Sequence, residues 1–247
     1  MKLDKDSKMN MISTFVVIMY TIPGAVGDSR CRAIGGNCQY DLSSCPGGVR
    51  SGLCNGPRAR RCCLPAPSTG GPCLTSSEMT ALENKLITYE AIRLTAYDPQ
   101  PQSRYEDLTI CVGFNLKRGG ARTVFRSVLP GVDFDSVYNR RASLTRNQCM
   151  ALSRHDLTQT YIPRAKRVAG NQFCGFPENV KIAIVNAVYR GDLAYNHRTA
   201  GYIRAGNWCA VADEYLDNYQ YRNCRRLGIP GVCTRLDWNA AQFRTMC

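Results

Sequence analysis

The sequence predicts an α+β fold, in which a mostly helical domain with a small β region follows a small disulfide-rich module. Two observations lead to this prediction. Six of the 14 cysteines crowd into residues 31–63, a glycine-rich segment without hydrophobic periodicity. Beyond residue 73 the apolar residues recur at helical spacing, and this spacing is interrupted early by a segment of alternating character, residues 98–115.

The first 27 residues have the composition of an export signal. Three lysines precede the apolar run 11–22, and the small residues 25–27 form a typical cleavage site. The run is shorter than the roughly 20 apolar residues that span a bilayer, and a polar segment follows it. We therefore expect residues 1–27 to be a signal peptide that starts at Met1 or Met9. The mature chain is expected to be secreted and extracellular, without stable membrane insertion.

The number and distribution of the cysteines predict disulfides and two parts of the chain that are bridged separately. An even number of cysteines after an export signal is typical of disulfide-bonded extracellular proteins. Zinc binding is disfavoured because the sequence has no C-x-x-C motif and only two histidines, and we expect neither a metal nor a cofactor. Six cysteines precede a Pro/Gly/Ser-rich stretch and eight follow it, so each part can close its own bridges. The predicted organisation is a cysteine-rich module at 28–64, a linker at 65–72 and a second domain at 73–247.

Helix signals place several elements in this second domain. The segments Thr75–Glu78 and Thr145–Gln148 match the capping-box pattern, in which two side chains bond each other's backbone N–H groups. They predict a helix that begins after Thr75 and another that runs to about Tyr161. Further helices are predicted after Pro177 and at 208–217.

The chain is strongly basic, with 32 Lys+Arg against 19 Asp+Glu and a net charge of +13. An exported protein of this charge is suited to anionic partners such as the bacterial surface. Nucleic acid is disfavoured as a partner, because export removes most access to it and no recognised binding motif is present. We expect a monomer.

Glu90 is the first candidate for catalysis. It continues by one turn the apolar stripe of Met79, Leu82 and Leu86, so we expect its carboxyl on the buried or cleft-facing side of the first helix. Desolvation raises the pKa of a carboxyl group, and a Glu that stays protonated near neutral pH can act as a general acid. The alternative is a structural Glu that pairs with Arg93 one turn on.

Two motifs follow one another in this region. Glu90, Arg93 and Tyr97 form the pattern E-x-x-R-x-x-x-Y, and Thr109–Gly113 read T-I-C-V-G. In this order they resemble the phage-type lysozyme family, which includes the lysozyme-like domain of pesticin. The second motif of that family is T-I-G-x-G, so Cys111 replaces its first glycine. The resemblance extends from the first helix to the C-terminus.

The resemblance implies a muramidase that hydrolyses the β-1,4 bond between N-acetylmuramic acid and N-acetylglucosamine in bacterial peptidoglycan, with inversion. Glu90 would protonate the leaving oxygen. Thr109 would help to hold the attacking water on the opposite face of the sugar. Inverting enzymes place a second carboxyl group about 6.5–9.5 Å from the acid, which leaves room for this water.

The second carboxylate is where the sequence departs from the family. The two positions at which family members carry an Asp are here Pro99 and Asn115. Asp98 and Asp107 are the remaining candidates, each with a turn residue as the alternative. We expect Asp98 to be the base, while Asn115 could instead hydrogen-bond the water.

Further supporting residues follow from the resemblance. The family places an Arg from its last helices near the catalytic Glu, where the cation holds the carboxyl in position, and we expect Arg235 in this role, with Arg226 as the alternative. Tyr97, which ends the first motif, is expected to support the site. Three aromatic residues could line a sugar cleft, with core packing as the alternative: Tyr189, Tyr195 and Trp208.

The N-terminal module is similar to cysteine-rich modules attached to secreted eukaryotic cell-wall hydrolases. Arg58, Arg60 and Arg61 give it a basic patch that would suit anionic wall polymers. The alternative is a stabilising cap without a ligand.

Two other functions compete with the muramidase. A non-catalytic cationic, disulfide-rich antimicrobial or wall-binding protein would use the charge and would not need Glu90. A glycosidase directed at chitin would use the same acid. For the muramidase, a role in antibacterial defence or in digestion fits equally well.

Overall fold

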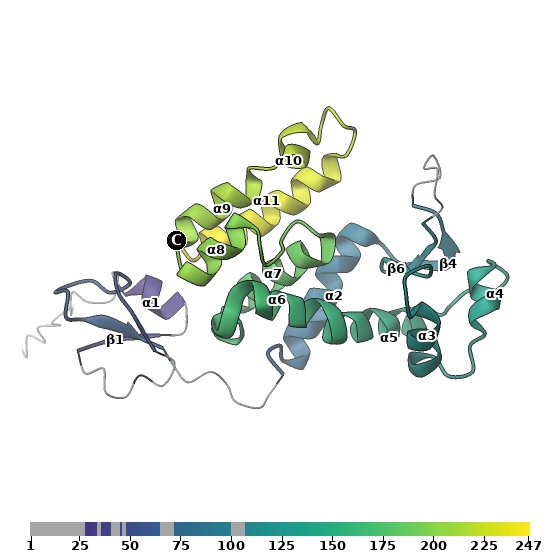
Figure 1. Ribbon diagram of the computed structural model, residues 1–247, viewed down its shortest axis with the longest axis horizontal. Coiled ribbons are helices and arrows are strands. Elements are labelled where there is room, and N and C mark those ends of the chain that lie inside the picture. The colour runs from purple at the N-terminus through teal and green to yellow at the C-terminus, as the bar shows by residue number, and fades with distance from the viewer. Residues whose placement is uncertain (1–27, 34–35, 41–44, 46–47, 65–71, 100–106) are drawn as a thin grey trace, which may run out of the picture.

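The computed structural model describes residues 28–247 except for five short segments: 34–35, 41–44, 46–47, 65–71 and 100–106 (Figure 1). The predicted signal peptide and nearly all of the predicted linker therefore lie outside the described residues. The fold is α+β and mostly helical, as predicted, with a disulfide-rich part at its N-terminal end. Within the described part of the chain, no helix has both the length and the apolar composition that a membrane span requires.

The cysteine-rich part, on the left of Figure 1, is a short helix beside a small antiparallel sheet. Its strands pair in the order β1-β3-β2. The elements are α1 (Ser29–Ala33), β1 (Asn37–Gln39), β2 (Val49–Arg50) and β3 (Arg61–Cys63). The buried cluster is small and consists of Cys31, Cys62 and Leu64. Bridges take the place of a larger core here, as is usual in segments of this size: Cys31–Cys62, Cys38–Cys54 and Cys45–Cys63.

The remaining cysteines are also paired, so disulfide formation, which the cysteine count predicted, is confirmed. All bridges join cysteines on the same side of residues 65–71. The bridges of the larger part are Cys73–Cys174, Cys111–Cys149, Cys209–Cys247 and Cys224–Cys233.

The larger part has two lobes, each with its own hydrophobic core. The small lobe, on the right of Figure 1, holds an antiparallel sheet of order β4-β5-β6 with helices around it. Its core includes the fully buried Ile110, Phe125 and Leu152. The sheet begins at residue 93, five residues before the expected β segment. The elements are β4 (Arg93–Tyr97), β5 (Thr109–Cys111), β6 (Phe114–Asn115), α3 (Ala121–Val128), α4 (Phe134–Tyr138) and α5 (Arg146–Asp156).

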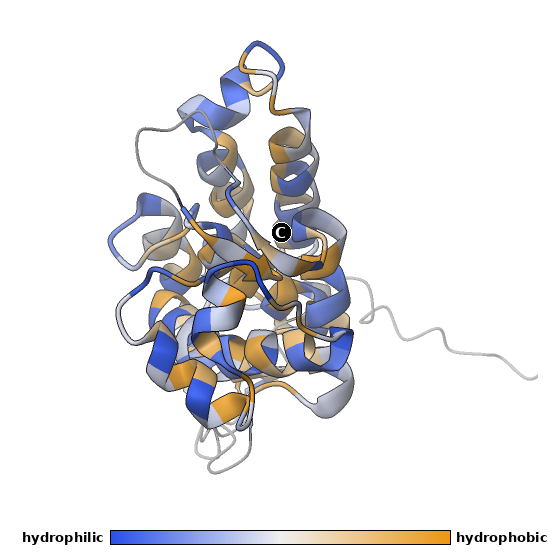
Figure 2. Ribbon diagram, turned by 90° about the vertical axis from the view of Figure 1, so that its right-hand side faces the viewer, coloured by the Kyte–Doolittle hydropathy of each residue, from blue (hydrophilic) through white to orange (hydrophobic). Residues whose placement is uncertain are grey.

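The large lobe is a helical bundle around α7 (Glu178–Arg190), which contacts α2, α6 and α11. Residues 180–188 of α7 are all buried, as expected of a helix that other helices surround. In Figure 2 the hydrophobic segments, in orange, gather where helices face one another. The other elements are α2 (Ser76–Glu90), α6 (Ile162–Ala169), the 3-10 segment η2 (Gly170–Gly175), α8 (Arg198–Ala205), α9 (Trp208–Leu216), α10 (Tyr219–Asn223) and α11 (Pro230–Arg244).

Two helical segments connect the lobes. One is α2, which begins with the predicted capping box at Thr75 and ends where the small lobe starts. The other is a continuous run of α5, the π-helix η1 (Leu157–Tyr161) and α6, which begins with the second predicted capping box at Thr145. This run continues eight residues past the predicted end at Tyr161. Pro163 lies within this run, shortly after the π-helical turn, and does not end it.

Candidate active site

Glu90 is the last residue of α2 and therefore lies at the junction of the two lobes. The next residue, Ala91, has φ 58° and ψ 179°, a backbone conformation that residues other than glycine rarely adopt. This turn ends the helix and directs the chain into β4. The Glu90 side chain is 28% exposed. Its carboxyl is thus partly desolvated and still open to a ligand.

Arg235 holds the Glu90 carboxyl. It reaches the site from α11, its side chain is 6% exposed, and its Nη1 donates to Oε1 of Glu90. The structure therefore brings together the predicted acid and the predicted arginine. Arg93 does not pair with Glu90, because α2 ends between them; its guanidinium lies 5.7 Å from the ring centroid of Tyr97. Arg226, the alternative cation, instead donates to Asn223 at 2.9 Å.

A buried polar network fixes Arg235 from behind. Its Nε and Nη2 donate to Oδ1 of Asn186 at 3.0 and 2.7 Å. The Asn186 amide donates to Asn239 at 2.9 Å, and Asn239 donates to the hydroxyl of Tyr215 at 2.8 Å. Both asparagines are fully buried. Burial raises the pKa of Tyr215 strongly, and the neutral hydroxyl donates in turn to Asp192 at 3.4 Å. The network joins α7, α9 and α11, so the packed large lobe sets the position of the cation.

Replacement of Asn186 by Ala is expected to lower the free energy of unfolding by about 2 kcal/mol, because two buried N–H groups of Arg235 would lose their acceptor. Urea unfolding followed by circular dichroism measures this. The matched control is Asn179→Ala on the same helix, where a partly exposed amide donates to Gln242 at 3.1 Å. We expect the control to lose less than about 1 kcal/mol. Equal losses in the two variants would contradict the role of Asn186 in holding Arg235.

A second polar cluster lies on the strands of the small lobe. Thr109 on β5 is paired in register with Asn115 on β6. Thr109 is buried, with 6% of the residue exposed, and its hydroxyl donates to the backbone carbonyl of Asp107 at 3.3 Å. The Asn115 amide donates to the Asp107 carboxylate. Cys111 has φ 61°, the left-handed conformation that favours glycine, and its disulfide ties β5 to α5. The strand pairing therefore gathers Thr109, Asn115 and Asp107.

The charges of Glu90 and of this cluster both act on Tyr97. Burial raises the pKa of the Tyr97 phenol, the negative charges of Glu90 and Asp107 raise it further, and Arg93 opposes them. Both carboxylates thus lie within electrostatic reach of one phenol. Asp98 accepts a hydrogen bond from the backbone N–H of Asp107 at 3.4 Å. The hydrogen bond from Asn115, which is paired with Thr109, favours Asp107 as the second carboxylate. The choice of Asp98 stays an untested prediction.

The predicted aromatic residues separate into different environments. The Tyr189 hydroxyl donates to the carbonyl of Val112, and its ring centroid lies 4.4 Å from that of Tyr161. Burial raises the pKa of Tyr189, and nearby Tyr161 and Glu90 add to this, so Tyr189 belongs to the surroundings of the acid. Trp208 belongs to the core, where its ring centroid lies 5.1 Å from that of Phe176.

The second motif comes close to α7 at Gly113, and this position requires a glycine. Its φ is 77°, and a Cβ atom at this position would lie only 2.9 Å from the Tyr189 hydroxyl. The motif glycine therefore allows the close approach of the strand turn to the aromatic pair.

The basic patch of the N-terminal part is smaller than its sequence predicts. Arg60 is engaged inside the module, where its Nη1 and Nη2 donate to the Asp28 carboxylate at 2.7 and 2.6 Å. This contact lowers the pKa of Asp28. Arg58 and Arg61 are exposed.

No family model matches the chain. Over 65 residues the chain is 37% identical to Lysozyme 1 of Crassostrea virginica. The aligned part makes up 26% of this chain and 35% of that protein. The chain thus spans about a third of the length of this relative.

Proposed function

We propose that the protein is a secreted lysozyme of the phage type, an inverting muramidase that hydrolyses the β-1,4 bond between N-acetylmuramic acid and N-acetylglucosamine in bacterial peptidoglycan. One observation carries the proposal: a partly exposed Glu90 is held by Arg235 at the junction of two lobes and shares the environment of Tyr97 with Asp107. The partial similarity to Lysozyme 1 supports the same class of enzyme.

Glu90 serves as the general acid. Arg235 binds one of its oxygens, Oε1, and this leaves the other oxygen, Oε2, free of that contact to deliver a proton. This proton passes to the glycosidic oxygen as the bond from that oxygen to the sugar carbon breaks. Because Asn186 and the helix packing fix Arg235, the carboxyl is already oriented when the substrate binds.

Asp107 serves as the base and Thr109 as the residue that positions water. A hydroxyl has one donor and two acceptor sites, so Thr109, which donates to the Asp107 carbonyl, can still accept a hydrogen bond from water. A carboxylate has about four lone-pair sites, and Asp107 uses one for the Asn115 amide. The water gives its proton to Asp107 and attacks the sugar carbon from the face opposite Glu90, which inverts the configuration.

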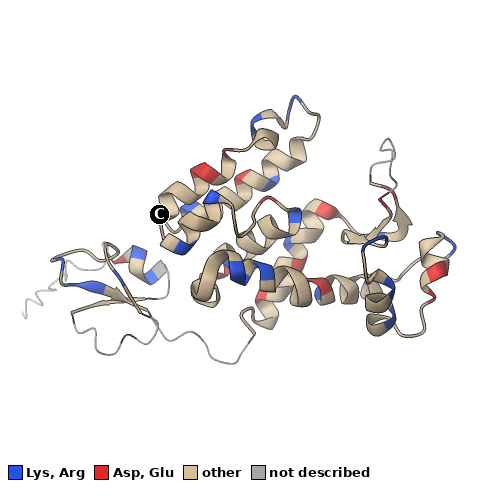
Figure 3. Cartoon of the chain, viewed as in Figure 1, with Lys and Arg blue, Asp and Glu red and all other residues tan. Residues whose placement is uncertain are grey.

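The proposed substrate and place of action agree with the charge of the chain. Basic residues, blue in Figure 3, are spread over both lobes and over the cysteine-rich part. A net charge of +13 favours contact with the anionic bacterial envelope. All cysteines are in disulfides, which form and persist outside the cell.

Analysis of the products tests the proposed function. Purified peptidoglycan treated with the protein is expected to release muropeptides whose reducing ends are all N-acetylmuramic acid, as read by mass spectrometry after borohydride reduction. N-acetylglucosamine at the reducing ends would contradict the muramidase. Cleavage of chitin oligomers together with intact peptidoglycan would instead establish the chitin-directed glycosidase.

A further inference from the structure

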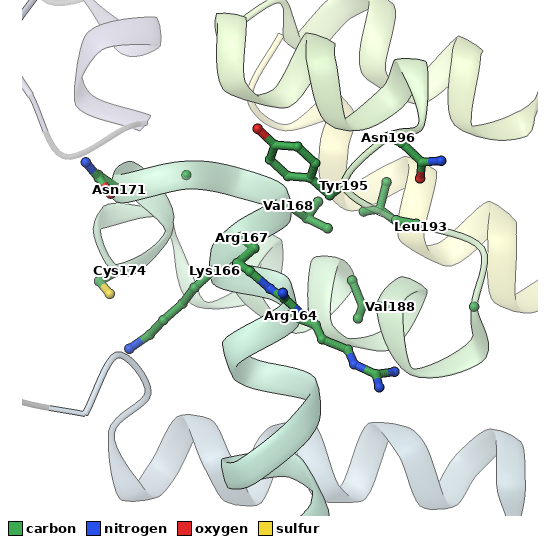
Figure 4. Close-up of a pocket in the computed structure, with 13 residues that line it drawn as sticks. Arg164, Lys166, Arg167, Val168, Asn171, Cys174, Val188, Leu193, Tyr195 and Asn196 are labelled. Atoms are coloured by element: carbon green, nitrogen blue, oxygen red, sulfur yellow. The ribbon is translucent and has the colours of Figure 1, made fainter.

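A large groove lies in the large lobe between the end of α6, the segment η2 and the loop that follows α7 (Figure 4). Its volume is about 1160 Å³, which is enough for a ligand the size of a lipid or an oligosaccharide. The groove shares no lining residue with the site around Glu90. Its lining consists of Arg164, Lys166, Arg167, Val168, Gly170, Asn171, Cys174, Val188, Gly191, Leu193, Ala194, Tyr195 and Asn196.

The floor of the groove is apolar. Val168, Val188 and Leu193 line it and belong to the core of the large lobe, with exposures of 2%, 6% and 2%. Ala194 extends this surface along the loop. Because the same residues pack against the bundle, the floor is preformed and does not depend on a ligand.

The rim of the groove is cationic. Arg164, Lys166 and Arg167 are exposed, and none of the three forms a salt bridge within the described ranges of the chain. No Asp or Glu lines the groove. In Figure 4 the three basic side chains all extend from α6, with Arg167 directed toward the middle of the view.

Tyr195 closes the opposite edge of the groove. It is 61% exposed, but the guanidinium of Arg204 lies 4.3 Å from its ring centroid. Arg204 also donates to the carbonyls of Val168 and Tyr195 at 3.0 and 3.2 Å. These contacts join the loop to the end of α6 and add a fourth positive charge beside the groove.

We propose that this groove binds an anionic amphiphile, a single molecule of a phosphate-bearing lipid. The aliphatic chain would cover Val168, Val188 and Leu193, and the phosphate would bind the guanidinium groups of Arg164 and Arg167, whose planar fork matches phosphate oxygens. A neutral glycan would leave the basic rim without a partner, and an inorganic anion would leave the apolar floor exposed to water. The combination of floor and rim therefore selects a ligand that has both parts.

Calorimetric titration of the full chain with octyl phosphate, below the concentration at which it forms micelles, tests the inference. We expect binding of one molecule per chain, weakened by added salt because ions screen contacts between phosphate and guanidinium. Inorganic phosphate and octanol, which each carry one half of the ligand, should bind at least about tenfold more weakly. Failure of octyl phosphate to bind, or equal binding of inorganic phosphate, would overturn the proposal. The measurement does not involve peptidoglycan, so its outcome is independent of the proposed muramidase.

Two variants locate the site. Arg164→Glu/Arg167→Glu should weaken octyl phosphate binding by at least about tenfold through the rim. Ala194→Trp should also weaken octyl phosphate binding, because the indole would occupy the space above the apolar floor. The matched control is Arg126→Glu/Arg146→Glu, which makes the same change in net charge at exposed positions of the small lobe and should leave the affinity unchanged. Equal weakening by the control pair would show a general effect of charge and overturn the assignment to the groove. Binding to anionic vesicles without binding of octyl phosphate would also overturn the assignment to the groove.

Discussion

Replacement of Glu90 by Gln is expected to lower the rate of peptidoglycan hydrolysis by at least about a thousandfold and to leave the fold intact. The amide has the shape of the acid, and its oxygen can still accept the hydrogen bond from Nη1 of Arg235. What the variant loses is the proton for the leaving oxygen. The rate is measured as loss of turbidity of a peptidoglycan suspension and as release of reducing ends.

The control for this variant is Glu178→Gln, which removes the same charge from an exposed residue in the first turn of α7. It should keep the full rate. Circular dichroism and the urea midpoint of Glu90→Gln should match those of the unchanged protein. If a folded Glu90→Gln variant clears the suspension as fast as the unchanged protein, the muramidase mechanism is wrong. The non-catalytic cationic protein would then be the better explanation.

Local signals in the sequence were sufficient for several elements of the fold. Both capping boxes, at Thr75 and Thr145, form as predicted, because each needs only residues three apart in the chain. The end of a helix was harder to predict. The helix that begins after Thr145 continues to Ala169 through a π-helical turn, because it is buried in both lobes and the packing of the two cores outweighs local preference.

Contacts between distant segments could not be predicted from periodicity. Arg235 meets Glu90 across 145 residues of sequence, and only the family resemblance pointed to this arginine. Asn186, which fixes Arg235, was missed. A signal was present, since Asn186 is the one polar residue in the apolar run 182–188 of α7, and a buried amide of this kind needs a polar partner. Periodicity shows that such a residue is buried but not which partner it has.

The second carboxylate is a choice between two acids that lie close together in the sequence. The sequence favours Asp98, because it stands next to the position that carries an acid in the family. In the structure, the pairing of β5 with β6 places Thr109 opposite Asn115, and Asn115 donates to Asp107. The register of the strands therefore decides which acid joins the residue proposed to position water. Register depends on strand pairing, which distance along the sequence does not define.

Replacement of Asp107 by Asn is therefore expected to cut the hydrolysis rate by about a hundredfold, the scale of one acid–base group. The amide oxygen can keep the hydrogen bond from Asn115, so the strand pairing should persist while the base is lost. The pH–rate profile should lose its acidic limb. The matched variant Asp98→Asn removes the same charge from a neighbouring acid and should reduce the rate by less than about tenfold.

The stereochemistry of the product tests the same assignment independently. If Asp107 activates water and does not attack the sugar, the first product must have the inverted anomeric configuration, which proton NMR reads before mutarotation. Retention of configuration would mean that a carboxylate acts as nucleophile. A hundredfold loss in Asp98→Asn with a near-normal rate in Asp107→Asn would restore Asp98 as the base. Near-normal rates in both variants would leave Thr109 and Asn115, which face each other on the paired strands, to hold the water without a carboxylate.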